Sequence, residues 1–215
     1  MKILITAGPT REKIDDVRFI SNYSSGKMGY ALANYAMELN HEVYLISGPV
    51  NLSAIDGVIT IKIESADQMH NEVLSLYKEM DVLIFAAAVA DFKPINYHQG
   101  KIKKTDDNDN MIIELKKNPD ILADISSKKS DNQIVVGFAL ESENEIENAI
   151  SKLKRKKCDL IVLNSANKPN SGFDGDYNTI TLIDINENIE EFPPMLKQDC
   201  SKVIFEKIFK LINKG

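Results

Sequence analysis

Short apolar runs alternate along this chain with longer stretches in which apolar residues recur every three or four positions. The runs are rich in β-branched residues and are bounded by glycine and proline, a pattern that favours buried strands. It predicts strands over residues 2–6, 42–47, 58–63, 82–88, 111–115, 134–139 and 159–163. The helical spacing predicts helices over residues 29–39, 66–77, 143–157 and 197–213, and a short helix opened by residues 118–120.

The run 82–88 is apolar at consecutive positions, which is typical of a strand that helices cover on both faces. Together with the alternation of strands and helices, it predicts an α/β fold with a Rossmann-like, doubly wound and mostly parallel sheet. Residues 179–184 and 189–192 predict a terminal hairpin, which makes a small antiparallel appendage. The sequence contains no repeat and no linker, so residues 1–215 are expected to form a single domain.

The composition narrows the class of protein. The chain is 43% hydrophobic and 27% charged, like an average globular protein, and its net charge of −6 disfavours a general nucleic-acid binder. Two distant cysteines disfavour a disulfide scaffold, and three scattered histidines predict no protein-held metal. The longest apolar stretch, residues 82–90, is about half of a membrane span. We therefore expect a cytoplasmic protein that binds neither membrane nor nucleic acid.

Small residues gather where the first strand ends and where the next helix begins. Gly8 follows the first strand, and Ser24, Ser25 and Gly26 precede the first long helix. Ligands bind at this edge of a doubly wound sheet, and a helix N-terminus favours an anion. The segments match neither the G-x-G-x-x-G fingerprint nor a Walker loop. Spacing alone leaves ligand binding and a plain turn with a helix cap about equal.

A second group of small residues ends the run 82–88. Ala86 and Ala87 leave room for a flat ring against the backbone, and Asp91 offers a carboxylate to a ligand's N–H or hydroxyl. Tight packing of the alanines and a solvated acid explain the same residues, and are slightly favoured when the motif is taken alone.

Two groups of lysines are candidates for phosphate binding. Residues 91–110 predict a long loop, and Lys101, Lys103 and Lys104 at its centre suit a lid that closes over phosphates. Lys152 and Lys156 lie four apart on one helix face, where a solvated face paired with glutamates is the default interpretation.

An alternative function is a nicotinamide-dependent oxidoreductase. Tyr23 and Lys27 have the Y-x-x-x-K spacing of short-chain dehydrogenases, but they precede the first long helix. The second strand ends at Ser47 without the acid that holds the ribose in NAD(P)-binding sheets. A non-catalytic nucleotide sensor is a third hypothesis, although it has no need of a lysine lid.

In combination and in order, these segments resemble phosphopantothenoylcysteine synthetases. The motifs are T-A-G-P-T-R-E from Thr6, D-D-V-R-F-I-S-N-Y-S-S-G-K-M-G from Asp15 and A-A-A-V-A-D-F from Ala86, followed by K-I-K-K, K-N-P-D-I and V-G-F-A. The resemblance runs from residue 2 to about residue 192 and looks like the stand-alone bacterial form.

The resemblance implies a reaction and its partners. CTP would activate 4′-phosphopantothenate as an acyl-cytidylate, and L-cysteine would then form an amide and release CMP. It further implies Mg²⁺ with the nucleotide, and a homodimer. The residues alone leave the choice between CTP and ATP open.

The resemblance also implies site residues. Asn22 would contact the acyl-nucleotide and support its conversion to product, and Lys101 would stabilise charge while the acyl-nucleotide forms. Residues 171–173 and the terminal hairpin are expected at the contact between subunits. The nucleotide-binding positions would be Gly8, Ser24, Ser25, Gly26, Phe85, Ala86, Ala87, Asp91, Lys101, Pro119, Asp120, Ile121, Leu122, Phe138, Lys152 and Lys156.

Overall fold

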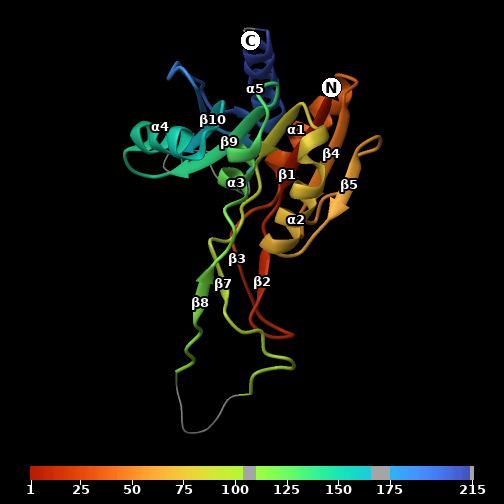
Figure 1. Ribbon diagram of the computed structural model, residues 1–215, viewed down its shortest axis with the longest axis vertical. Coiled ribbons are helices and arrows are strands. Elements are labelled where there is room, and N and C mark those ends of the chain that lie inside the picture. The colour runs from red at the N-terminus through yellow and green to blue at the C-terminus, as the bar shows by residue number, and fades with distance from the viewer. Residues whose placement is uncertain (104–109, 166–174, 214–215) are drawn as a thin grey trace.

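The computed structural model describes residues 1–103, 110–165 and 175–213, and an eight-stranded sheet lies at its centre (Figure 1). Across the sheet the strands are β13 (Ile189–Glu191), β12 (Ile180–Asp184), β10 (Leu160–Ser165), β9 (Ile134–Glu141), β6 (Val82–Phe85), β1 (Lys2–Ala7), β4 (Glu42–Ser47) and β5 (Ile59–Lys62).

Six of these strands are parallel, and two form an antiparallel edge. From β5 to β10 the parallel strands follow the spatial order 3-2-1-4-5-6 of Rossmann sheets. β12 runs antiparallel to β10, and β13 runs antiparallel to β12. The predicted doubly wound, mostly parallel sheet with its terminal hairpin is therefore confirmed.

Helices cover both faces of the sheet and create two cores. α1 (Lys27–Glu38) and α5 (Lys197–Ile212) pack on one face. α2 (Ala66–Leu76), η1 (Tyr77–Glu79), α3 (Ile121–Lys128) and α4 (Glu145–Lys156) pack on the other. Successive strand residues point to opposite faces, so Ile3 and Ile5 enter the first core and Leu4 enters the second, all fully buried.

Four short strands leave the sheet and form a projection that we call the arm (Figure 1). β2 (Arg11–Lys13) and β3 (Phe19–Ser21) pair antiparallel between β1 and α1. β7 (Phe92–Pro94) and β8 (Leu115–Lys117) pair antiparallel between β6 and α3. The arm therefore grows from the carboxyl ends of two adjacent parallel strands.

A buried carboxylate holds the two halves of the arm together. Asp15, 1% exposed, accepts backbone hydrogen bonds from Val17, Arg18 and Ile102, the last at 3.0 Å. It also forms an ion pair with the Arg18 guanidinium. The hydrogen bond to that guanidinium and the backbone N–H groups keep the pKa of Asp15 far below its ordinary value, against the effect of burial.

The arm corrects one prediction. Residues 91–110 are not a single loop, because Phe92–Pro94 pairs with β8. Three residues are too few for a recognisable period, and Pro94 reads as a strand breaker, although a short paired strand accommodates it. Lys101 and Lys103 lie beyond this strand, whereas Lys104 and the predicted contact at 171–173 fall outside the described residues.

Other differences concern the ends of elements and very short strands. The strand predicted over 82–88 ends at Phe85, and the strand predicted over 111–115 lies at Leu115–Lys117. β11 (Tyr177–Asn178) and β14 (Met195–Leu196), which pair with each other, had no sequence signal. α2 begins with a reciprocal capping box formed by Ser65 and Gln68.

Candidate functional site

The carboxyl ends of β1 and β6 lie next to each other where the strand order reverses, which is the usual ligand edge of such a sheet. The two chain segments that follow remain joined beyond the sheet. The Ala88 N–H donates to the Gly8 carbonyl at 2.9 Å, and the Ala90 N–H donates to Thr10 Oγ1 at 3.1 Å. These bonds fix the backbone around which the site is built.

Three cavities follow one another along this edge. The α4 cavity, of about 770 Å³, lies between helix α4, the start of α3 and the base of the arm. The central cavity, of about 540 Å³, lies between the end of β6, β9 and the start of α1. The α1 cavity, of about 680 Å³, lies between the start of α1, β2–β3 and residues 49–52. Asp91 and Lys152 line the first two cavities, and Asn22 and Ser24 line the last two, so the three form a continuous row.

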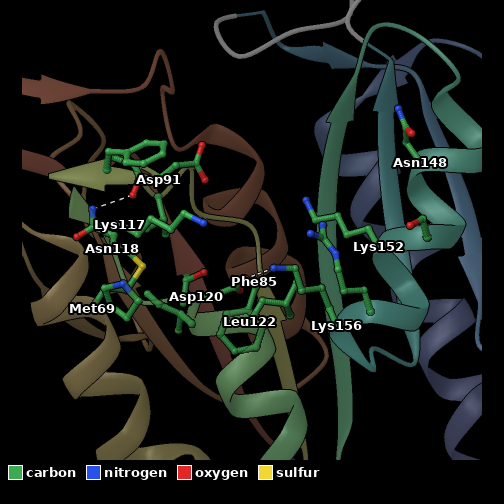
Figure 2. A pocket seen from close by; sticks show the side chains of 18 of the residues that line it. Met69, Phe85, Asp91, Lys117, Asn118, Asp120, Leu122, Asn148, Lys152 and Lys156 are labelled. Atoms are coloured by element: carbon green, nitrogen blue, oxygen red, sulfur yellow. Dashed lines mark hydrogen bonds and ion pairs between the residues drawn. The ribbon is translucent and has the colours of Figure 1, made fainter. Parts of the chain in front are cut away.

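The α4 cavity gathers many of the predicted nucleotide-binding residues. Figure 2 shows Lys152 and Lys156 projecting from α4 toward the opposite wall, where Asp91 and Asp120 lie. The predicted residues that line this cavity are Phe85, Asp91, Pro119, Asp120, Ile121, Leu122, Lys152 and Lys156.

Asp120 begins helix α3 and faces α4. One of its oxygens accepts the Ala123 N–H at 3.1 Å as an N-cap, and the other pairs with Lys156. Burial opposes ionisation of Asp120, but the Lys156 ammonium and the Ala123 N–H hold its pKa below the ordinary value. Lys156 and Asp120 therefore bridge the floor of the cavity as a charged pair.

Lys152 is partly buried and lines both the α4 cavity and the central cavity. Its Nζ donates to the Phe138 carbonyl at 2.8 Å. Burial lowers the pKa of Lys152, and the nearby charges of Lys156 and Arg155 lower it further, whereas Glu141 acts in the opposite direction. An anion in the cavity would relieve this destabilisation of the ammonium form.

The central cavity contains Asn22 together with Ser24, Gly26, Ala86 and Phe138. The Asn22 side-chain amide donates to the backbone oxygens of Ala88 and Val89, at 3.3 and 3.0 Å. A neutral amide held in this way orients a ligand without acting as a base.

The start of α1 faces the central cavity with its backbone donors uncapped by a side chain. Gly26 occupies the N-cap position with φ 78°, makes no side-chain cap hydrogen bond, and no acidic residue lies in the first turn. A Cβ at Gly26 would lie 2.7 Å from Val50 Cγ1, so the position requires glycine for space as well as for backbone conformation. The N–H groups of the first turn and the helix dipole favour a bound anion.

Four predicted residues lie elsewhere. Gly8 lines none of the three cavities. Its φ of 74° and its close approach to Gly26 instead let the end of β1 lie against the start of α1. The Ala87 N–H donates to Thr6 Oγ1, and Ser25 lines the α1 cavity. Lys101 is exposed on the arm and is not a lining residue of any of the three cavities.

Sequence reasoning missed several residues that line the α4 cavity. For those on α4 the available signal was a helical period, since positions 148, 151, 152, 155 and 156 fall on one face of the helix. Among the missed residues are Lys117, Glu141, Asn148, Ser151 and Arg155.

The described residues lack two features, a cluster of metal ligands and a membrane-spanning helix. Residues 1–103, 110–165 and 175–213 contain no group of three or more His, Cys, Asp or Glu side chains placed to hold a metal. Within the same ranges, no helix has both the length and the apolar character needed to cross a membrane.

The chain is similar to known proteins in both fold and sequence. The crystal structure of the C-terminal domain of coenzyme A biosynthesis bifunctional protein CoaBC is 38% identical, with a TM-score of 0.85 over 100% of this chain and 96% of that one. The CoaBC protein of Bacillus subtilis strain 168 is 45% identical over 210 residues, which is 97% of this chain and 51% of its own length.

A further relative, from an unidentified prokaryote, is named cysteine/cysteine sulfinic acid decarboxylase. It is 45% identical over 213 residues, 99% of this chain and 59% of that protein. The chain thus spans between about half and three fifths of these two curated relatives. The model of the DNA/pantothenate metabolism flavoprotein C-terminal domain matches residues 1–212, and the chain belongs to that family.

Proposed function

We propose that this chain joins 4′-phosphopantothenate to L-cysteine in coenzyme A synthesis, with CTP as the activating nucleotide. The observation that carries the proposal is the row of cavities, in which Asn22 lies between a lysine-lined end and the uncapped start of α1. The role in coenzyme A biosynthesis named for the CoaBC relatives supports the same reaction class.

In the first step, the carboxylate of 4′-phosphopantothenate attacks the α-phosphorus of CTP. A carboxylate–phosphorus bond forms, the bond from the α-phosphorus to the bridging oxygen breaks, and pyrophosphate leaves. We place the triphosphate in the α4 cavity, where Lys152 and Lys156 would offset its negative charge. The substrate's own phosphate would lie against the start of α1.

In the second step, the cysteine amine attacks the acyl carbonyl. A C–N bond forms, the C–O bond to the phosphate breaks, CMP leaves, and the amine loses a proton. Asn22 would hold the acyl-phosphate in the central cavity, because its amide is already oriented by the Val89 and Ala88 carbonyls. Orientation is a large part of the barrier for such a transfer.

We propose Mg²⁺ as the accompanying ion, where it would neutralise phosphate charge. The acidic side chains of the α4 cavity are Asp91, Asp120 and Glu141, and Asp120 is already paired with Lys156. So few carboxylates suit an Mg²⁺ that is bound chiefly by the nucleotide phosphates, with one or two protein oxygens at most.

We further propose a homodimer in which the arm of one copy contacts the other. The arm carries exposed apolar side chains, among them Val17 at 59%, Tyr97 at 52% and Ile112 at 90% exposure. Such a patch is typical of a surface that another chain covers. Lys101 lies on the same arm, so contact between copies would bring it to the phosphates of the partner's site.

The oxidoreductase alternative has less support. β4 ends at Ser47, whose hydroxyl is engaged with the Gly48 carbonyl at 2.9 Å and the Tyr30 hydroxyl at 3.2 Å. A ribose would meet no carboxylate at that position.

The test combines purified protein with Mg²⁺, 4′-phosphopantothenate and a panel of nucleoside triphosphates. With CTP we expect pyrophosphate release, and we expect CMP and the amide only when L-cysteine is added. Oxidation of NADPH in place of these products would support the oxidoreductase. Nucleotide binding without pyrophosphate release would support the sensor hypothesis.

A further inference from the structure

Two cations of the α4 cavity have no hydrogen-bond or ion-pair partner among the residues that the structure describes, although the charge of Arg155 acts on nearby Asp120. Lys156 pairs with Asp120, and Lys152 donates to the Phe138 carbonyl. Lys117 and Arg155 also line the cavity, and their side chains make no hydrogen bond or ion pair with any residue that the structure describes.

The two cations belong to opposite walls. Lys117 ends β8 at the base of the arm, and the following residue, Asn118, fixes that wall by donating to the backbone oxygens of Asp91 and Ala90 at 2.9 and 2.8 Å. Figure 2 shows Lys117 and Lys152 pointing toward each other across the cavity. Arg155 lies one helical turn beyond Lys152 on the same face of α4.

Neither cation is explained by the fold. Both are exposed, so neither packs into a core. With Lys152 and Lys156 they give the cavity four cationic side chains against the three carboxylates of Asp91, Asp120 and Glu141. Like charges in one cavity repel unless an anion joins them. A ligand with several negative charges is the partner that this arrangement fits. A guanidinium also binds two phosphate oxygens at once.

We propose that Arg155 and Lys117 form a clamp that grips the β- and γ-phosphates of the nucleoside triphosphate from opposite walls. The inference rests on the proposed function, which places a triphosphate in this cavity. The clamp holds the pyrophosphate leaving group and makes no contact with the nucleoside monophosphate. The site therefore binds CTP more tightly than CMP, and CMP leaves readily at the end of the reaction.

The test measures the binding of CTP, CMP and inorganic tripolyphosphate by calorimetry. We expect Arg155→Gln and Lys117→Gln each to weaken CTP and tripolyphosphate binding by about 10- to 100-fold, since each removes charged hydrogen bonds. CMP binding should stay within about twofold. Arg155→Lys should recover part of the loss, because charge is kept while the fork geometry is lost.

The chain offers two matched controls. Lys154→Gln removes one positive charge from α4 at a residue that pairs with Glu187 and does not line the cavity. Lys116→Gln does the same on β8, where the side chain lines a different cavity with Lys93. Both controls should bind all three ligands as the parent protein does.

Several results would overturn the clamp. Parent-like CTP and tripolyphosphate affinity in either Gln variant removes that residue from it. Equal loss of CTP and CMP binding assigns the residue to the nucleoside part or to the fold. If the two controls lose as much affinity as the two variants, the loss is explained by the change in net charge and not by a clamp. Tripolyphosphate binding through Arg155 and Lys117 without ligation activity would keep the clamp while refuting the proposed function.

Discussion

The side-chain amide of Asn22 donates to the backbone oxygen of Val89 at 3.0 Å. The bond joins the segment before α1 to the segment after β6, 67 positions apart in the chain. Those segments follow adjacent parallel strands and line the central cavity. The backbone of the segment after β6 therefore fixes the orientation of the Asn22 amide in the segment before α1. That relationship makes Asn22 the residue whose substitution is most informative.

Asn22→Asp should separate the two steps of the proposed reaction. The carboxylate cannot donate to the Val89 and Ala88 oxygens and is repelled by them. We expect pyrophosphate release to persist and amide formation to fall by about 100-fold or more, a typical cost of losing a positioned donor. The measurement is quenched-flow analysis of pyrophosphate and CMP. Asn186→Asp, at an exposed turn, is the control, and a parent-like amide yield in Asn22→Asp would contradict the assigned role.

Lys101→Gln should slow the first step alone. The side chain is exposed on the arm, so its loss leaves the fold intact, while the charge that would neutralise the reacting phosphates disappears. We expect pyrophosphate release to fall by about 100-fold and the circular dichroism spectrum to remain unchanged. Lys78→Gln, an exposed lysine outside the arm and the three cavities, should behave as the parent. Undiminished pyrophosphate release would exclude Lys101 from the reaction.

As pH rises, triphosphate binding should weaken at a lower pH than it would if the site depended on a lysine with an ordinary pKa. Burial lowers the pKa of Lys152 from 10.5, and the charged form is the one that attracts phosphate. Affinity is therefore complete below the lowered pKa and is lost as pH rises through it. Titrations between about pH 7 and 10 measure this loss. Lys152→Arg, which stays charged, should remove the pH dependence, and an unaltered profile in that variant would refute the assignment.

Gly29→Ala should move the start of α1 away from β1. A Cβ at this position would lie 2.5 Å from the Cβ of Ala7 and 3.2 Å from the Thr6 carbonyl oxygen, so the helix must shift. We expect a loss of about 1–3 kcal/mol in the free energy of unfolding, as overpacking of a core usually causes. Phosphate-bearing substrates should bind more weakly as well. Gly175→Ala is the control, because the nearest atom to its Cβ lies at 3.9 Å.

The ion pair of Asp184 with Lys207, 2.7 Å apart and almost fully buried, should make stability depend on pH. Burial opposes ionisation of Asp184, but Lys207 and Asn188 hold its pKa below the ordinary 3.8. The folded state thus gains stability above the ordinary pKa and loses it as pH falls below that value. Asp184→Asn should cost about 3 kcal/mol at neutral pH, because Glu190 still partners Lys207. Urea unfolding from pH 3 to 7 measures the free energy of unfolding of the parent and the variant. If that free energy falls as steeply with decreasing pH in the variant as in the parent, the prediction is contradicted.

Most of the sheet could be predicted because its strands carry strong local signals. The central strands β1, β6, β9 and β10 are rich in consecutive apolar residues that helices cover on both faces, which favours a parallel α/β arrangement. The arm could not be predicted in the same way. Its strands are three residues long, and their pairing depends on the Asp15 carboxylate, whose partners Arg18 and Ile102 are brought together only by folding.

The candidate site likewise combines features with local sequence signals and features that depend on folding. Its motifs are local, so the glycine and serine segment before α1, the alanines after β6 and the start of α3 could be located from residue order alone. The residues alone could not assign the face of α4, because a row of polar residues at helical spacing suits open solvent as well as a cavity wall, and only the resemblance pointed to Lys152 and Lys156. Arg155 was overlooked for this reason.

Local patterns in the chain were enough to predict the alternation of strands and helices, the burial of the sheet on both faces and the motifs at its carboxyl edge, since each depends on neighbours a few positions away. Folding alone brings Asn22 to Val89, sets Lys117 opposite α4 across a cavity, and puts Lys101 out on the arm. Such relationships join residues far apart in the chain. They are set by the packing of two cores and by the point at which the strand order reverses, and no local propensity encodes either.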